Sequence, residues 1–98
     1  MRMIRHLIFF KFKPDVEKSA VQEALESLRA LPAQISAIKK FEVGENIIQS
    51  ARSWDAAMIG EYESLAALDQ YIKHEAHQAV VAKLGAVCER VASVDYEF

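Results

Sequence analysis

The sequence predicts an α+β fold whose elements follow one another in the order β-α-β-β-α-β. Two observations lead to this order. Strand-like apolar runs open the chain, close it and occupy its middle, and the segments between them repeat apolar residues at the three- and four-residue spacing of a helix. The 98 residues have the length of one domain, which we place at residues 1–98.

Residues 3–13 form the first predicted strand, which is apolar on both faces. One face carries Ile4, His6, Ile8, Phe10 and Phe12, and the other carries Met3, Leu7 and Phe9. Because successive strand side chains point to opposite sides, such a strand must be covered on both sides. Pro14 ends the strand, and Asp15 is placed to cap the helix that follows.

A helix over residues 16–31 and a strand over residues 37–48 come next. The helix has an apolar stripe at Val21, Leu25, Leu28 and Leu31, and Pro32 opposes its continuation. The strand has its apolar positions at Ile38, Phe41, Val43 and Ile47. Gly44 within it predicts a bulge or a bend.

The second half begins with a strand from Trp54 to Tyr62, after which Ser64 is a candidate N-cap. The helix that Ser64 starts has an apolar face formed by Leu65, Leu68, Tyr71 and Ile72. We expect a break near His74, followed by a helical stretch that carries His77, Val80, Val81, Leu84 and Cys88. The last predicted strand covers residues 91–98.

This order, without a glycine-rich phosphate loop, predicts the ferredoxin-like arrangement, an antiparallel four-stranded sheet with its helices on one face. The other sheet face then carries uncovered apolar residues, such as Leu7 and Phe9. A second copy of the chain, related by a two-fold axis, would cover them. The sequence therefore predicts a homodimer that pairs through the sheet face into an α+β barrel.

Composition argues against several other classes of protein. The 12 basic and 14 acidic residues are interspersed and give a net charge of −2, so no basic surface for nucleic acid is indicated. No apolar run approaches the ~20 residues of a membrane span, and the apolar run Leu7–Phe10 is too short for a signal peptide. The single cysteine, Cys88, cannot form an internal disulfide, which fits a cytoplasmic protein.

Four stretches together resemble the stress-responsive A/B barrel family, a branch of the dimeric α+β barrel superfamily. They are "IRHLIFFKFKPDV", "FEVGENI", "SLAALDQYIKHEAHQAVV" and "VDYEF", which occur in the family's order and span nearly the whole chain. The resemblance implies homodimers whose sheets form a central barrel. It does not imply one function, because the family includes ring-forming stress proteins as well as enzymes of the olivetolic acid cyclase type.

The cyclase-type members carry a Tyr-x-x-His-Pro-x-His motif, and the resemblance implies three site residues here. The catalytic tyrosine and histidine match Tyr71 and His77, and a pocket histidine of the first strand matches His6. A further pocket histidine falls at or near Ala56 and is therefore missing. Glu75 replaces the proline of the motif.

The residues themselves allow the same pocket. His77 shares an apolar helix face with Leu84, and His6 shares the strand face of Ile8. If those faces meet, the polar groups converge in an apolar pocket, where His77 is a candidate base and Tyr71 a candidate hydrogen-bond donor or acid, with His6 in a positioning role. The alternative is that these are packing residues with ordinary hydrogen-bond partners.

Other candidate sites have weaker support. His74 and His77 are spaced to chelate a metal, but two ligands do not make a site, and His74 is better explained by a place near a helix C-terminus. We expect no metal and no cofactor. Cys88 is expected to be buried on the helix face of Leu84, and Trp54 to lie in the core or at an interface.

Three functions remain compatible with the sequence. The first is a homodimer that binds a small apolar ligand between sheet and helices, with or without cyclase-like acid–base chemistry. The second is a structural, stress-related oligomer without chemistry, and the third is a cofactor-free monooxygenase. A sizeable apolar cavity would favour the first or the third, whereas a filled core with a large outer interface would favour the second.

Overall fold

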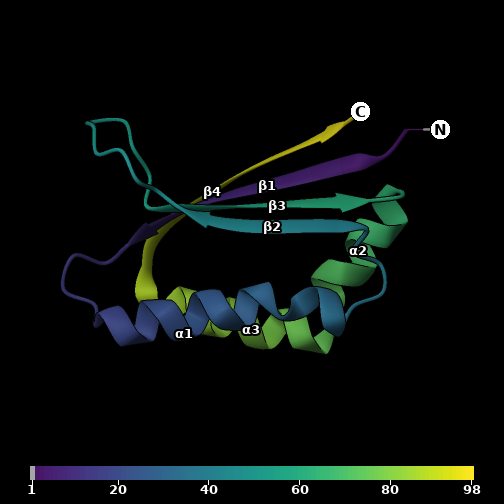
Figure 1. Cartoon of the computed structure of the whole chain (residues 1–98). Coiled ribbons are helices and arrows are strands. Elements are labelled where there is room, and N and C mark those ends of the chain that lie inside the picture. Colours follow the sequence, from purple (N-terminus) through teal and green to yellow (C-terminus); the bar gives the residue numbers. More distant parts are fainter. Residues whose placement is uncertain (1) are drawn as a thin grey trace.

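A four-stranded antiparallel sheet forms one layer of the molecule, and the helices form the other (Figure 1). The structure is a computed structural model and describes residues 2–98. Its elements are β1 (Ile4–Phe12), α1 (Lys18–Arg29), the short 3-10 helix η1 (Leu31–Ala33), β2 (Lys40–Glu45), β3 (Ala56–Tyr62), α2 (Leu65–Lys73), α3 (Glu75–Val87) and β4 (Cys88–Glu97).

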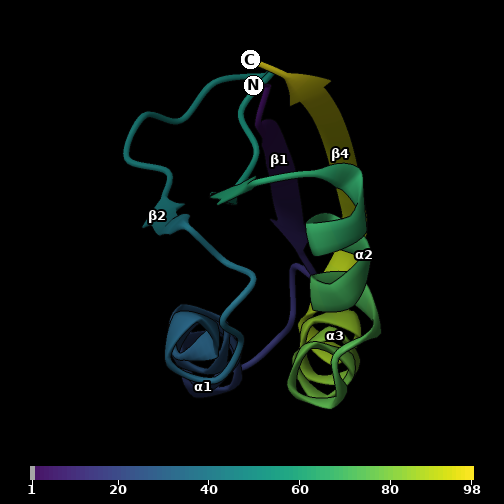
Figure 2. The same cartoon turned by 90° about the vertical axis from the view of Figure 1, so that its right-hand side faces the viewer.

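The strand order in the sheet is β2-β3-β1-β4, and every neighbouring pair is antiparallel. Both α1 and α3 lie under the same face, α1 below β2 and α3 toward the side of β4 (Figure 2). This is the ferredoxin-like arrangement, so the predicted fold class is confirmed. Since β1 and β4 run antiparallel, the two ends of the described chain lie together, and the Met3 and Phe98 backbones exchange two hydrogen bonds of 3.0 Å.

The core lies between the sheet and the helices. The predicted stripe of α1 is buried, and Leu31 extends it into η1. From the sheet, Ile4, Phe10, Met58 and Tyr62 point toward the helices and are buried. The inner strand face and the helix stripe predicted from the sequence therefore meet as expected.

The second helical segment breaks at His74, as predicted. Ser64 caps α2 by accepting a 3.1 Å hydrogen bond from the Ala67 amide, which confirms its predicted role. His74 is both the C-cap of α2 and the N-cap of α3, and its extended backbone turns the chain between the two helices. This break brings the start of α3 under the sheet next to Tyr71.

Three predictions about local structure are wrong. Asp15 does not cap α1, because the helix starts later, after Glu17, which makes no side-chain cap. Gly44 forms no bulge, because β2 pairs with β3 in unbroken register and the space beside Gly44 is open. Cys88 is buried as predicted, but it begins β4 opposite Phe12 and is not on the helix face of Leu84.

The strand predicted over residues 37–48 has other limits in the structure, and some residues predicted on apolar helix faces are exposed. The strand expected over residues 37–48 is shorter, because Ile38 lies in a turn and Ile47 in an exposed loop. Leu65 is 69% exposed in the first turn of α2, which lies at one end of the sheet (Figure 1). Val81 is likewise exposed.

The outer face of the sheet is apolar at its centre. The strand register places Leu7 between Ile59 and Val94, and Phe9 between Ala57 and Ala92. No helix of residues 2–98 covers this face in Figure 1, but Trp54, in the loop between β2 and β3, packs against Phe9 there. At one end of it, the Arg5 guanidinium forms a 2.8 Å ion pair with Glu61 and lies 3.8 Å from the Phe98 ring centre.

Among residues 2–98, no helix is both long enough and apolar enough to cross a bilayer.

Candidate functional site

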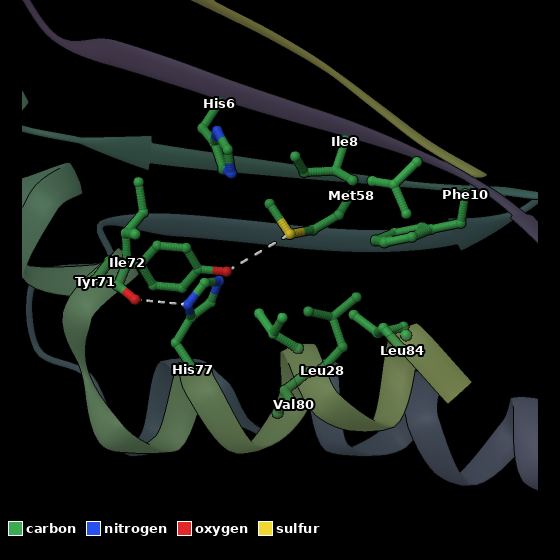
Figure 3. A pocket seen from close by; sticks show the side chains of 13 residues that line it. His6, Ile8, Phe10, Leu28, Met58, Tyr71, Ile72, His77, Val80 and Leu84 are labelled. Atoms are coloured by element: carbon green, nitrogen blue, oxygen red, sulfur yellow. Dashed lines mark hydrogen bonds between the residues drawn. The ribbon is translucent and has the colours of Figure 1, made fainter. Parts of the chain in front are cut away.

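A pocket of about 360 Å³ lies between the inner sheet face and α3 (Figure 3). Most of its wall is aliphatic or aromatic, and its polar side chains are His6, Tyr71 and His77. These three come from β1, α2 and α3, and Figure 3 shows them at one end of the pocket, with Phe10 and Leu84 at the other. The pocket thus has one polar end and one apolar end.

The imidazole of His77 points from the first turns of α3 into the pocket (Figure 3). Its Nδ1 atom lies 2.9 Å from the carbonyl oxygen of Ile72, which can only accept a hydrogen bond, so Nδ1 carries the proton. Burial lowers the pKa of His77, and proximity to His6 lowers it further, against the opposing effect of the Ile72 carbonyl. His77 is therefore neutral at pH 7, with a free lone pair on Nε2.

The phenol of Tyr71 is 1% exposed and packs against His77, with ring centres 4.4 Å apart. Burial raises the pKa of Tyr71 to about 12, so its hydroxyl stays protonated. That hydroxyl lies 3.8 Å from the Met58 sulfur, which is a weak acceptor. Tyr71 can therefore exchange this partner for a better one.

His6 reaches the same end of the pocket from β1 (Figure 3), and its ring centre lies 6.1 Å from that of Tyr71. Its Nδ1 atom forms a short hydrogen bond with the Asp95 carboxylate of β4. A carboxylate at Nδ1 fixes the ring orientation and favours the tautomer with Nε2 free. The three residues selected from the sequence thus do meet in one pocket.

Asp95 is a site residue that the sequence reasoning missed. A signal for it existed: with antiparallel pairing of the first and last strands, Asp95 lies directly opposite His6. Met58 and Tyr62 were also missed, because an inner-facing strand residue beside a functional group has the same pattern as any core residue.

The remaining candidates lie outside the pocket. His74 is exposed, and its Nδ1 accepts a 3.0 Å hydrogen bond from the Ala76 amide at the start of α3. His74 does lie at the C-terminus of α2, as predicted, and its side chain also caps the start of α3. Within residues 2–98 no three His, Cys, Asp or Glu side chains are grouped to hold a metal ion. Trp54 packs against Phe9 and under Arg90, away from the pocket.

Comparison with known proteins identifies the family. Residues 4–98 match the model of the stress responsive A/B barrel domain, which covers almost the whole chain. The chain belongs to this family. The resemblance seen in the sequence is thereby confirmed.

Two similar proteins, one compared by sequence and one by its solved structure, are described as uncharacterized or of unknown function. An uncharacterized protein of Streptomyces coelicolor is 36% identical over 98 residues, covering 98% of this chain and all of that protein. A dimeric protein of unknown function with a ferredoxin-like fold, from Bacteroides fragilis, is 35% identical, with a TM-score of 0.84 and coverage of 98% of this chain and 96% of that one.

An enzyme shares the fold. The hydroxynitrile lyase of Passiflora edulis superposes with a TM-score of 0.88 over 98% of this chain and 93% of that one, but only 14% of the residues are identical. At that identity the likeness concerns the fold alone.

Proposed function

We propose that the pocket binds a small, largely apolar molecule that carries a carbonyl oxygen, and that its polar end moves a proton next to that oxygen. One observation carries the proposal: Tyr71, His6 and a neutral His77 converge at one end of an otherwise apolar pocket. The volume of about 360 Å³ is within the range of small-molecule sites.

The proposed chemistry starts with the lone pair on Nε2 of His77. It removes a proton from the carbon next to the ligand carbonyl, the C–H electron pair moves into the carbonyl as an enolate, and the proton stays on His77. Tyr71 donates a hydrogen bond to the oxygen as it becomes negative. His6, oriented by Asp95, lies beside Tyr71 at this end of the pocket and has a positioning role. The enolate then takes the proton back, or its carbon attacks a second carbonyl of the same ligand, whose oxygen takes the proton from His77 as the new C–C bond forms.

A purely structural role has less support. A structural oligomer would gain most from a filled layer between sheet and helices, because unfilled apolar space costs stability. Here the space remains open at the position where three polar side chains meet. A cavity with convergent polar groups is what a binding protein needs.

We also propose that the chain forms a homodimer through the outer face of its sheet. Leu7, Ile59 and Val94 lie side by side on that face, and Val94 is more than half exposed. The relative from Bacteroides fragilis is described as dimeric. Pairing of two such faces would remove an apolar patch from water, which is the usual driving force for a two-fold interface.

The test uses acetophenone as a probe small enough for the pocket. Proton exchange of its methyl group in D₂O, followed by NMR, reports removal of a proton next to a carbonyl without requiring the natural substrate. We expect the wild-type protein to accelerate exchange, and His77→Ala to abolish the acceleration. His74→Ala is the matched control, since His74 is three residues from His77 and outside the pocket. This variant should retain the accelerated exchange.

Amide chemical shifts measured in the same titration separate binding from chemistry. Chemical-shift changes at residues that line the pocket, without faster proton exchange of acetophenone, would mean that the protein binds the ketone but does not remove its proton. That result would overturn the proposed proton transfer. Absence of shifts at millimolar acetophenone and at millimolar concentrations of larger aryl ketones would overturn the proposed ligand class.

A further inference from the structure

Tyr62 presents a feature that packing alone does not explain. Its ring is 0% exposed on the inner face of β3, and within residues 2–98 its hydroxyl is a buried side-chain oxygen without a hydrogen-bond partner. Phenylalanine would fill the same volume without burying an unpaired polar atom, which costs stability. A buried hydroxyl in this condition therefore calls for an explanation in terms of function.

Gly60 provides the space for this hydroxyl. A Cβ atom at position 60 would lie 2.7 Å from the Tyr62 oxygen and 2.9 Å from a ring carbon, closer than such atoms can approach. Gly60 pairs with His6 across the sheet, so the Tyr62 hydroxyl is held beside the polar end of the pocket. Any larger residue at position 60 would push the ring away.

Tyr71 is the neighbour to which the Tyr62 hydroxyl can donate. The two ring centres are 5.1 Å apart. Burial raises the pKa of Tyr62 most, and the Tyr71 phenol raises it further, whereas Tyr62 acts on Tyr71 in the opposite sense and lowers its pKa. Because the Tyr71 hydroxyl donates its proton to the Met58 sulfur, the lone pairs of the Tyr71 oxygen are free to accept a hydrogen bond from Tyr62. The Tyr71 proton then remains available for a ligand.

We propose that Tyr62 is a positioning residue that strengthens Tyr71 as a hydrogen-bond donor, so that the pocket selects ligands whose buried end carries an acceptor oxygen. When a ligand binds, Tyr62 donates to the Tyr71 oxygen, and Tyr71 turns its own proton from the weak Met58 sulfur to the ligand oxygen. The hydrogen bond from Tyr62 to Tyr71 polarises the hydrogen bond from Tyr71 to the ligand, and each strengthens the other. This inference rests on the proposed pocket function and names its specificity.

The first test needs no ligand. The protein is produced with fluorinated tyrosine, whose phenol ionises at lower pH, and the chain's three tyrosines are titrated by ¹⁹F NMR. We expect Tyr62→Phe to raise the pKa of Tyr71, because the donor to its oxygen is lost. Tyr96→Phe is the matched control on the outer sheet face and should leave Tyr71 unchanged. A Tyr71 pKa that stays the same or falls in Tyr62→Phe would overturn the proposal.

The second test compares acetophenone with ethylbenzene, which has nearly the same shape but no oxygen. We expect Tyr62→Phe to reduce the preference for the ketone by about threefold to tenfold, with the affinity for ethylbenzene unchanged. An equal loss for both probes, or an unchanged preference, would make Tyr62 a packing residue and overturn the inference. If neither probe binds the wild type, the proposed function fails, and the ligand-free titration still decides the role of Tyr62.

Discussion

The carbonyl oxygen of Ile72 accepts hydrogen bonds from both Nδ1 of His77 and the side-chain amide of Gln78, each at 2.9 Å. In a continuous helix this oxygen would accept a backbone amide. The break at His74 makes it available, because α2 ends at Lys73 and α3 starts at Glu75. The helix break therefore sets the tautomer of His77 and turns its Nε2 lone pair toward the pocket.

The first prediction concerns the titration of His77. Because burial lowers its pKa, we expect a midpoint below the ordinary value of 6.5, with Nδ1 protonated in the neutral form. Long-range ¹H–¹⁵N NMR spectra measure both, and His77→Gln identifies the resonance. A midpoint at or above 6.5, or a proton on Nε2, would contradict the assigned geometry.

The same shift has a consequence for stability. In the window between the lowered folded pKa and the unfolded value near 6.5, the unfolded chain binds more protons, so stability rises with pH. The contribution of His77 is complete above about pH 6.5 and is lost as the pH falls through its folded pKa. Urea denaturation at several pH values should show a smaller loss on acidification in His77→Gln than in the wild type.

The second prediction concerns the cap at the helix break. The variant His74→Ala removes the side-chain acceptor for the Ala76 amide. We expect a decrease of about 1 kcal/mol in the free energy of unfolding, the usual cost of a lost N-cap, measured by urea denaturation. Gln70→Ala, an exposed change in the preceding helix, serves as the control. Equal stability of both variants would show that the cap contributes nothing.

The third prediction concerns the pair formed by Gly60 and Tyr62. We expect Gly60→Ala to lower the free energy of unfolding by about 1–3 kcal/mol, because the new methyl group must displace a buried ring. In a Tyr62→Ala background the obstruction is absent, so the same change should cost little. This double-mutant cycle measures the coupling directly. An equal cost in both backgrounds would mean that Gly60 is required for some other reason.

The fourth prediction tests the outer sheet face. We expect Leu7→Lys to convert the proposed dimer into monomers in analytical ultracentrifugation, since it places a charge at the centre of the apolar face. Leu65→Lys makes the same chemical change at an exposed position on α2 and should leave the dimer intact. A dimer that persists in Leu7→Lys would place the interface elsewhere.

The resemblance to the family pointed to His6, Tyr71 and His77. The strand period of two and the helix period of 3.6 residues then placed each of them on an apolar face. Neither argument found Asp95 or Tyr62. Asp95 looks like an ordinary strand-end charge until its pairing with His6 is known, and Tyr62 looks like a core aromatic until its oxygen is found to be unpaired.

The sequence by itself determined the order of the elements, the two-faced first strand, the helix break and the family. The first three depend on local periodicity and capping, which act between near neighbours in the chain, and the family follows from a resemblance that spans nearly the whole chain. Only the tertiary structure decided that His77 is neutral with Nε2 free, that Asp95 orients His6, and that Gly60 makes room for Tyr62. Each of these depends on burial, strand register or a distance of a few ångströms, which are set by the packing of distant segments.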